Sequence, residues 1–149
     1  MTNYIHINET NKEFHLTNGK ISYIFRVMEQ TNTLEQLYAG KTIKHRESFG
    51  HLIEREVRPS NNQVTGDHTT SLEHVKQEMP VYGTTDFRYP GLEIRYPEGD
   101  RISQFEYQSY QVEKGKKKLP DVPATFAGAE EATTLRILLK DRYSDLILT

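Results

Sequence analysis

The sequence predicts an all-β domain, an antiparallel sandwich. Most of its recognisable elements are short segments in which apolar and polar residues alternate, the period of a half-buried strand. Turn residues separate these segments at short intervals, which is typical of antiparallel sandwiches. Strands do not alternate with long helical patterns, which argues against a parallel α/β sheet.

The amino-terminal strands follow from alternation and one turn signal. Tyr4 to Ile7 and Glu13 to Leu16 each alternate over the length of a short strand. Asn18-Gly19 predicts a hairpin with a type I′ turn, because both residues tolerate a positive φ. In Lys20 to Met28 both faces carry apolar residues, so we expect this strand to be covered on both sides.

One strand and a long loop come next. Thr33 to Tyr38 is predicted to be a strand that Gly40 closes. Lys44 to Val81 has neither the helical nor the strand period, and loops of this length are usually functional or disordered. Within the loop, Leu72 and Val75 lie three residues apart, which supports a single helical turn.

The carboxyl-terminal half returns to strands and turns. Pro97-Glu98-Gly99-Asp100 and Lys114-Gly115-Lys116 have turn compositions. The strands predicted around these turns are Leu92 to Tyr96, Ile102 to Tyr107, Tyr110 to Glu113, Thr133 to Lys140 and Leu146 to Leu148. The last strand is shorter than the usual length of about five to six residues, so we expect residues 1–149 to be a single domain of a longer protein.

Composition and charge argue against several classes of protein. The 149 residues include 19 Lys and Arg against 21 Asp and Glu, a net charge of −2, whereas nucleic-acid-binding faces are strongly basic. The absence of cysteine removes disulfides, thiolate metal ligands and thiol nucleophiles. No stretch approaches about 18 apolar residues, and the first ten residues lack the pattern of a secretory signal. We therefore expect a cytoplasmic protein that binds neither nucleic acid nor membrane.

The side chains that could catalyse a reaction or bind a metal are scattered. The six histidines are His6, His15, His45, His51, His68 and His74. No pair has the i,i+4 or i,i+2 spacing that brings two imidazoles to one ion, so we interpret them as surface residues. The sequence has no G-x-S-x-G turn and no glycine-rich phosphate loop. We predict no catalytic residue, no metal site and no cofactor.

One segment of the long loop is a candidate sugar-binding site. Ile53-Glu54-Arg55-Glu56 places charges of both signs beside the apolar Leu52. Carboxylate and guanidinium groups supply the acceptors and the fixed donors that hold sugar hydroxyls. From these residues alone, an ordinary salt bridge within the loop is the simpler interpretation.

Aromatic residues gather in a second segment. They are Tyr82, Phe87, Tyr89 and Tyr96. Such a group forms either a packed loop or a surface on which a ligand stacks, and we favour packing. Asp86 and Arg88 are predicted to hold this segment together by hydrogen bonds to its backbone.

The same segment carries a resemblance to a known family. Residues 77–90, Gln-Glu-Met-Pro-Val-Tyr-Gly-Thr-Thr-Asp-Phe-Arg-Tyr-Pro, resemble the Gly-x-x-Asp-Phe-Arg-x-Pro region of the amino-terminal domain of bacterial α-galactosidases of glycoside hydrolase family 36, the melibiase type. Further matches are Phe14-His15-Leu16 with Ile21-Ser22-Tyr23, Leu37-Tyr38 with Gly40-Lys41, Lys114-Gly115-Lys116 with Leu119-Pro120-Asp121-Val122-Pro123-Ala124-Thr125, and Glu131-Ala132-Thr133-Thr134-Leu135. Their order and spacing cover nearly the whole chain.

The resemblance implies a fold and a place in a larger enzyme. It implies an antiparallel β-supersandwich of the galactose-mutarotase-like type, placed before a (β/α)8 barrel. In that family two barrel aspartates act as nucleophile and acid/base with retention of configuration, and both would lie beyond Thr149. The resemblance therefore implies that this chain by itself is inactive.

The resemblance also gives the long loop a role. In similar enzymes the amino-terminal domain builds a tetramer, and its loop reaches the active site of a neighbouring subunit. There an Asp-Arg pair provides an Asp that binds the substrate sugar. The corresponding place here is Leu52-Ile53-Glu54-Arg55, with Glu in place of Asp and one extra residue. Glu54 and Arg55 are therefore the predicted substrate-binding residues.

Two functional hypotheses come from different classes. The first is the non-catalytic domain of a retaining α-galactosidase for melibiose- and raffinose-type sugars, whose partners would be those sugars, the downstream barrel and further copies of the protein. An α-N-acetylgalactosaminidase or transglycosylase parent remains an alternative. The second hypothesis is a stand-alone carbohydrate-binding or structural interaction module. A barrel encoded downstream would separate the two.

Overall fold

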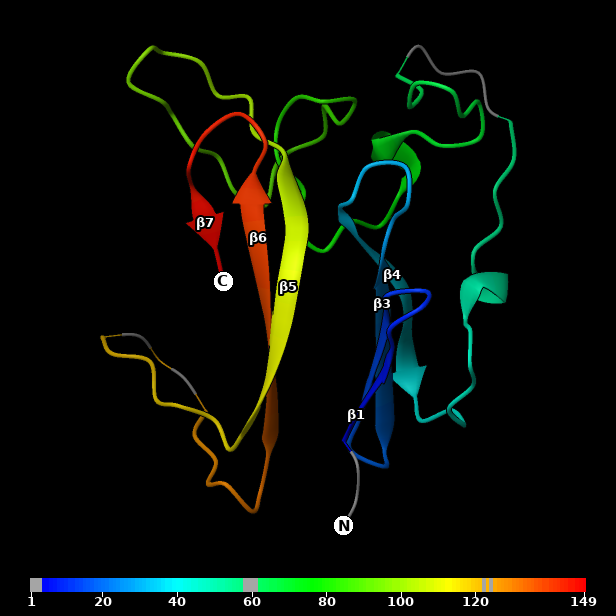
Figure 1. Cartoon of the computed structure of the whole chain (residues 1–149), viewed down its shortest axis with the longest axis vertical. Helices are drawn as coiled ribbons and strands as arrows, with labels where there is room; N and C mark the ends of the chain where they lie inside the picture. The colour runs from blue at the N-terminus through cyan, green and yellow to red at the C-terminus, as the bar shows by residue number, and fades with distance from the viewer. Residues whose placement is uncertain (1–3, 58–61, 122, 124) are drawn as a thin grey trace.

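Two antiparallel sheets stand face to face in the computed structural model, which describes residues 4–57, 62–121, 123 and 125–149 (Figure 1). The first sheet contains, in spatial order, β1 (Ile5–Asn8), β2 (Glu13–Thr17), β3 (Ile21–Val27) and β4 (Leu34–Lys41). The second contains β5 (Phe105–Lys114), β6 (Thr133–Asp141) and β7 (Ile147–Leu148). The predicted all-β antiparallel sandwich is confirmed. Residues 58–61 of the long loop, and Val122 and Ala124 of the matched motif, lie outside the described ranges.

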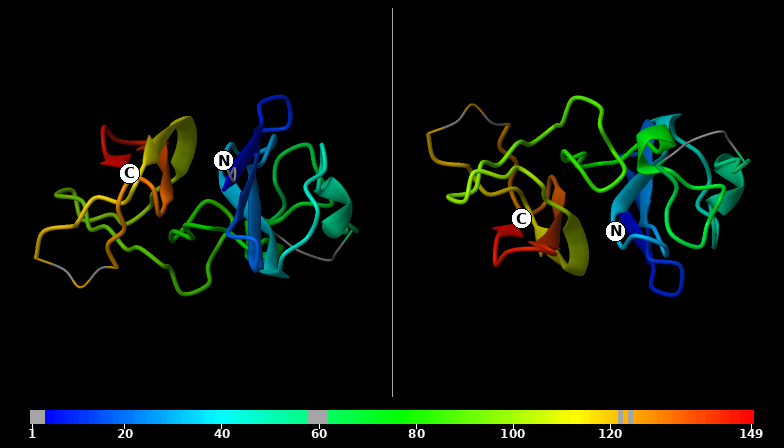
Figure 2. Two further views of the ribbon diagram at one scale, coloured as in Figure 1. Left: turned by 90° about the horizontal axis from the view of Figure 1, so that it is seen from below. Right: turned by 90° about the horizontal axis from the view of Figure 1, so that it is seen from above.

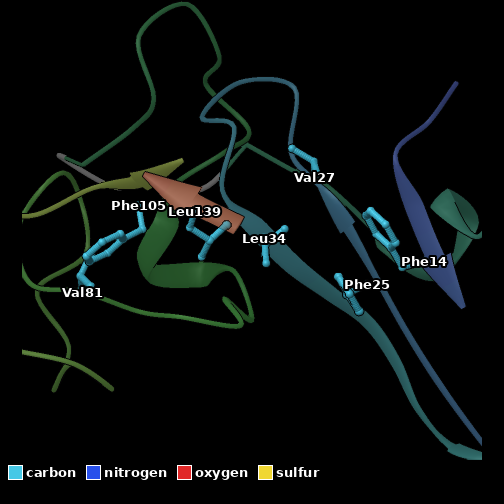
Figure 3. Close-up of a cluster of buried hydrophobic side chains, with 7 residues drawn as sticks. All are labelled: Phe14, Phe25, Val27, Leu34, Val81, Phe105 and Leu139. Atoms are coloured by element: carbon cyan, nitrogen blue, oxygen red, sulfur yellow. The ribbon is translucent and has the colours of Figure 1, made fainter. Parts of the chain in front are cut away.

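The main hydrophobic core lies between the two sheets (Figure 3). Its buried members are Phe14, Phe25, Val27, Leu34, Val81, Phe105 and Leu139. The rings of Phe14 and Phe25 stack with centroids 5.0 Å apart, and the edge of Tyr110 from the second sheet meets Phe14 at 5.4 Å. These side chains come from alternate positions of each strand, which is why alternation in the sequence predicts them.

A short turn joins the two sheets through hydrogen bonds. Asn32, between β3 and β4, has a positive φ of 56°, a conformation that asparagine tolerates better than most residues. Its side-chain amide donates to the carbonyl of Tyr107 at 2.9 Å, and its own carbonyl accepts from the Tyr107 N–H at 2.8 Å. This pair of bonds fixes β5 against the end of the first sheet.

Strand β3 is covered on both sides for most of its length, as predicted. Phe25 and Val27 face the second sheet. Ile24 faces the other way and packs with Leu37 and Phe49 in a separate cluster. The register of β3 against β4 shifts between Ile24 and Phe25, so that Leu37 is the extra residue of a bulge.

Two predicted strands of the second sheet are one. The predicted strands Ile102 to Tyr107 and Tyr110 to Glu113 merge into the single strand β5, which pairs with β6 along its length. β5 begins at Phe105, three residues later than predicted. The register shifts between Tyr107 and Ser109, so the chain passes the apparent break with a bulge. The continuous partner strand holds the two halves in one ladder.

The prediction of a strand at Leu92 to Tyr96 is wrong. Only Leu92 meets a partner, in an isolated parallel bridge with Val81. A strand needs a ladder of successive pairs, and no neighbouring strand supplies one here. The turn that follows is confirmed, with the Gly99 N–H donating to the Tyr96 carbonyl at 2.9 Å and a φ of 96° at Gly99.

Two predicted turn details are also wrong. Three residues, Asn18 to Lys20, connect β2 to β3, and only Gly19 among them has a positive φ, which rules out type I′. The Asn18 side chain instead accepts hydrogen bonds from the backbone N–H groups of Lys20 and Ile21, each at 3.0 Å. Gly40 does not close β4, because the strand runs on to Lys41 with the Tyr38 phenol lying across the glycine.

Candidate functional site

The long loop begins by crossing the outer face of the first sheet, the face turned away from the second sheet (Figures 1 and 2). We call residues 42–57 the covering loop. Its apolar contact is Phe49, 2% exposed, which packs with Ile24 and Leu37. Ile43 and Ile53 pack around this cluster. The sequence predicts few apolar contacts in the loop, and the remaining contacts are polar.

The first polar contact is the buried carboxylate of Glu13 on β2. It accepts hydrogen bonds from the Ser48 hydroxyl at 3.1 Å and from the Phe49 N–H at 2.8 Å. The Asn8 side-chain amide, at the end of β1, donates to the carbonyl of Glu47. These bonds position the middle of the covering loop.

The second polar contact joins three histidines. His15 on β2 is 2% exposed, and its Nδ1 lies 3.2 Å from Nδ1 of His45 in the covering loop. His6 on β1 stacks on His45 with centroids 4.4 Å apart. The surface interpretation is wrong for His15, which is buried, whereas His45 is exposed as predicted. The three are not scattered, because strand pairing sets His6 opposite His15 and the rings of both lie close to that of His45.

The surroundings of His15 and His6 favour their neutral forms. Burial, and then the proximity of His45 and His6, lowers the pKa of His15 to about 4. Burial and His45 lower the pKa of His6 in the same direction. Nε2 of His15 also lies 2.8 Å from the Ser22 hydroxyl, which accepts a hydrogen bond from the Ile43 N–H at 3.1 Å.

The third polar contact involves one of the two predicted site residues. Arg55 donates to the carboxylate of Glu35 on β4, and Nε of Arg26 on β3 donates to the same carboxylate at 3.2 Å. The Glu35 side chain is 1% exposed, so two cations satisfy one buried anion. Arg55 thus makes a salt bridge to the sheet, and the salt bridge expected within the loop is replaced by a long-range one.

Glu54 lies beside Arg55 with a different environment. Its side chain is exposed, and within the described ranges no hydrogen bond or ion pair occupies its carboxylate. The structure therefore separates the two predicted residues into an exposed carboxylate and a guanidinium held by the sheet. Glu35 was not predicted, because the sequence Leu34-Glu35-Gln36 does not mark it as buried and its partner Arg55 lies twenty residues away.

The aromatic segment is only partly packed. Asp86 is buried and accepts from the backbone N–H and side chain of Arg88 and from Gln77 at 2.7 Å, so its predicted structural role is confirmed. Burial acts to raise the pKa of Asp86, but the hydrogen bonds and charge of Arg88 outweigh it and lower that pKa. Phe87 is exposed and Tyr89 is 96% exposed, so the packing interpretation is wrong for these two rings.

Neither a metal site nor a membrane-spanning helix is found among the described residues. In them no group of three or more His, Asp or Glu side chains has the geometry of a metal site, and the three histidines above are included in that statement. No helix in the same ranges has the length and hydropathy needed to cross a membrane.

Comparison with known families decides the membership of the chain. Residues 32–149 match the glycosyl hydrolase family 36 N-terminal domain. The chain belongs to this family. The match includes β4, the covering loop with Glu54 and Arg55, the Asp86–Arg88 segment and the whole second sheet.

Curated relatives of this family 36 domain are α-galactosidases. The chain is 36% identical over 146 residues to alpha-galactosidase 1 of Pediococcus pentosaceus and 34% identical over 143 residues to alpha-galactosidase AgaA of Geobacillus stearothermophilus. Each alignment covers 95% of this chain and 20% of the relative. The chain thus spans about a fifth of the length of these relatives.

Solved structures give the same result for the fold. The α-galactosidase of Lactobacillus brevis superposes with a TM-score of 0.89 at 31% identity, over 96% of this chain and 19% of that one. A variant of AgaA from Geobacillus stearothermophilus, in complex with raffinose, superposes with a TM-score of 0.82 at 34% identity, over 91% and 19%. The family 36 domain therefore has the fold that the resemblance implied.

Proposed function

We propose that this chain is the non-catalytic amino-terminal domain of an α-galactosidase that hydrolyses terminal α-galactosides of the melibiose and raffinose type. Family membership and the α-galactosidase relatives support the proposal. In this proposal the catalytic aspartates belong to a downstream (β/α)8 barrel of a retaining hydrolase. Residues 1–149 alone would then release no galactose from an aryl α-galactoside, because acid and nucleophile must flank one bond.

Within that enzyme, Glu54 would accept hydrogen bonds from sugar hydroxyls and Arg55 would orient it. One observation carries this assignment: Glu54 presents a carboxylate to solvent, next to an arginine that is fixed to the buried Glu35. A loop fixed at the adjacent residue presents an acceptor in a defined direction, and a charged acceptor is worth more to a hydroxyl than a neutral one.

The domain would also take part in assembly. We propose that the parent enzyme is a tetramer and that the covering loop completes the active site of a neighbouring subunit. The position of this loop on the outer face, away from the core between the sheets, leaves Glu54 accessible to such a neighbour. The cytoplasmic location remains a prediction.

The test is Glu54→Gln in the full-length parent enzyme. Glutamine keeps the size and one acceptor but removes the charge, and a hydrogen bond to a charged group contributes about 1.5–3 kcal/mol. The KM for raffinose should therefore rise roughly tenfold to a hundredfold, with an unchanged melting temperature and an intact tetramer.

Glu56→Gln is the matched control, since it changes another exposed carboxylate two residues away. Its effect on KM should be the smaller of the two. If Glu54→Gln leaves the kinetics unchanged, Glu54 is an ordinary loop charge. If Glu56→Gln has the larger effect, the sugar-binding position is Glu56 and the assignment is displaced by two residues.

A further inference from the structure

Two histidine side chains, His15 of β2 and His45 of the covering loop, face each other through ring nitrogens, and the proposed function gives this contact no role. Nδ1 of His15 and Nδ1 of His45 lie 3.2 Å apart, a hydrogen-bond distance. One hydrogen fits between them, because a donor must face an acceptor. When both rings are protonated, each nitrogen carries a hydrogen and the two N–H groups face each other. The contact then becomes a repulsion between two cations.

We propose that His15 and His45 are positioning residues for the covering loop, which stays on the sheet only while the two rings share one hydrogen between their facing nitrogens. The neutral pair meets this condition, and so does the pair with one extra proton. The pair with two extra protons does not. Docking of the loop therefore releases a proton relative to two free, fully protonated rings.

The groups that contact the two rings carry no negative charge. His6 from β1 stacks on His45 and adds a third titrating ring to the same place. The Ser22 hydroxyl from β3 contacts Nε2 of His15, and the Phe49 ring edge contacts the His15 ring at a centroid distance of 5.3 Å. The carboxylate on the same face of β2, Glu13, accepts hydrogen bonds from Ser48 and from the Phe49 N–H.

Further charged and titratable groups near the pair belong to the covering loop itself. Lys44, Arg46 and Glu47 flank His45 in the sequence and are exposed to solvent. His51 stacks near Phe49 with centroids 6.4 Å apart, on the side of the ring that continues the loop. Solvent therefore screens these charges, whereas the His15 ring is buried.

The sign of the pH dependence follows from the position of His15. Its pKa is lowered from 6.5 to about 4 in the docked state, so it binds a proton less tightly there than it would with the loop displaced and the ring open to solvent. Docking is therefore strongest above pH 6.5 and weakens as the pH falls from 6.5 towards 4. These two pKa values give a loss of roughly thirtyfold in the docking equilibrium between pH 7.5 and pH 5.

The test is amide hydrogen exchange, measured by NMR on this 149-residue chain. The N–H groups of Ile43 and Phe49 donate to the sheet side chains of Ser22 and Glu13, so their protection factors report docking. Both should fall roughly thirtyfold from pH 7.5 to pH 5, whereas the Val27 N–H in the first sheet keeps its protection. Constant protection at Ile43 and Phe49, or an equal loss at Val27, would overturn the proposal.

A pair of variants separates this mechanism from general acid sensitivity. His15→Gln keeps an amide that can bond to both Ser22 and His45 but does not titrate, so the pH dependence at Ile43 and Phe49 should disappear. His51→Gln makes the same chemical change elsewhere in the loop and should keep the thirtyfold loss. The proposal is contradicted if the pH dependence of protection at Ile43 and Phe49 is lost equally in both variants. If His15→Gln does not fold, an NMR titration of His15 in the unsubstituted 149-residue chain takes its place. A pKa of His15 at or above 6.5 overturns the proposal.

The effect on substrate binding rests on the proposed function of Glu54. Acidification to pH 5 should raise the KM for raffinose more in the unsubstituted full-length enzyme than in the full-length enzyme that carries His15→Gln. The exchange measurements on this chain involve no sugar and no catalysis. A failure of the loop mechanism is therefore distinguishable from a failure of the sugar-binding assignment.

Discussion

The two faces of the first sheet bury their residues by different chemistry. The inner face holds Phe14, Phe25 and Val27 against Phe105 and Leu139 of the second sheet. The outer face is covered by a loop that contacts the sheet through one buried phenylalanine and through polar side chains that include Glu13, His15 and Glu35. The same strands thus serve a hydrophobic core on one side and a set of hydrogen bonds and ion pairs on the other.

This difference separates the stability of the fold from the position of the loop. Burial of apolar surface depends weakly on pH and salt, whereas ion pairs and shared protons depend strongly on both. A protein that needs a constant framework and a responsive loop obtains both from one sheet. Four changes test this separation.

Phe14→Ala should have the largest effect, because Phe14 is buried at the centre of the inner face. Truncating a buried phenylalanine costs about 3–5 kcal/mol of unfolding free energy. Urea unfolding of the chain measures this cost. Tyr89→Ala is the control at a 96% exposed ring and should change stability by less than about 0.5 kcal/mol. If Phe14→Ala and Tyr89→Ala lower the unfolding free energy equally, the inner face is not the core that stabilises the fold.

Glu35→Gln should come second. The variant removes the negative charge that both Arg26 and Arg55 contact, and hydrogen bonds to a charged group contribute about 1.5–3 kcal/mol. Because the arginines are partly exposed, the loss should lie at the lower end of that range. Amide exchange should show a larger loss of protection in the covering loop than in the strands of the first sheet. Glu54→Gln, at an exposed carboxylate of the same loop, should leave the unfolding free energy of the chain unchanged.

Ser22→Ala should have a smaller effect, about 1 kcal/mol. The variant leaves the Ile43 N–H and Nε2 of His15 without their partner on the outer face of the sheet, but no charged group loses a hydrogen bond, in contrast to Glu35→Gln. Protection of the Ile43 N–H against exchange should fall, while the N–H groups that pair β3 with β2 and β4 keep their protection. A loss of protection throughout β3 would show that the two faces are not separable at this position.

Glu78→Gln should have the smallest effect and the opposite sign. Glu78 lies on the inner side, where burial raises its pKa despite the hydrogen bonds donated by the Tyr23 hydroxyl at 2.6 Å. A raised pKa means that the folded chain binds this proton more tightly, so stability is lost as the pH rises through that pKa. The variant should therefore be at least as stable as the parent at pH 7. A clear destabilisation there, in thermal unfolding, would contradict this sign.

Most of the fold could be predicted from the sequence, since alternation is a local property. The limits of β2 and β6, to within one residue, and both faces of β3 follow from which residues are apolar. The failures have a common cause. Whether Leu92 to Tyr96 is a strand, and whether β5 is one strand or two, depends on a partner strand that lies elsewhere in the chain.

The candidate site divides in the same way. The charged residue types at Glu54 and Arg55, together with the family resemblance, lead to the covering loop. The partner of Arg55 is Glu35, twenty residues earlier, and only the folded chain brings them together. The histidines behave alike: His6, His15 and His45 have no metal-binding spacing and are nevertheless in mutual ring contact.

The sequence by itself determined the fold class, the family and the loop that carries the exposed carboxylate, because composition, alternation and ordered motifs are read along the chain. Tertiary structure decided which face of the sheet the loop covers, which carboxylate holds Arg55 and which two histidine nitrogens face each other. These depend on strand register, where a shift of one residue would turn Glu13, His15 and Glu35 to the inner face. The register comes from the packing of two complete sheets, and no local segment contains it.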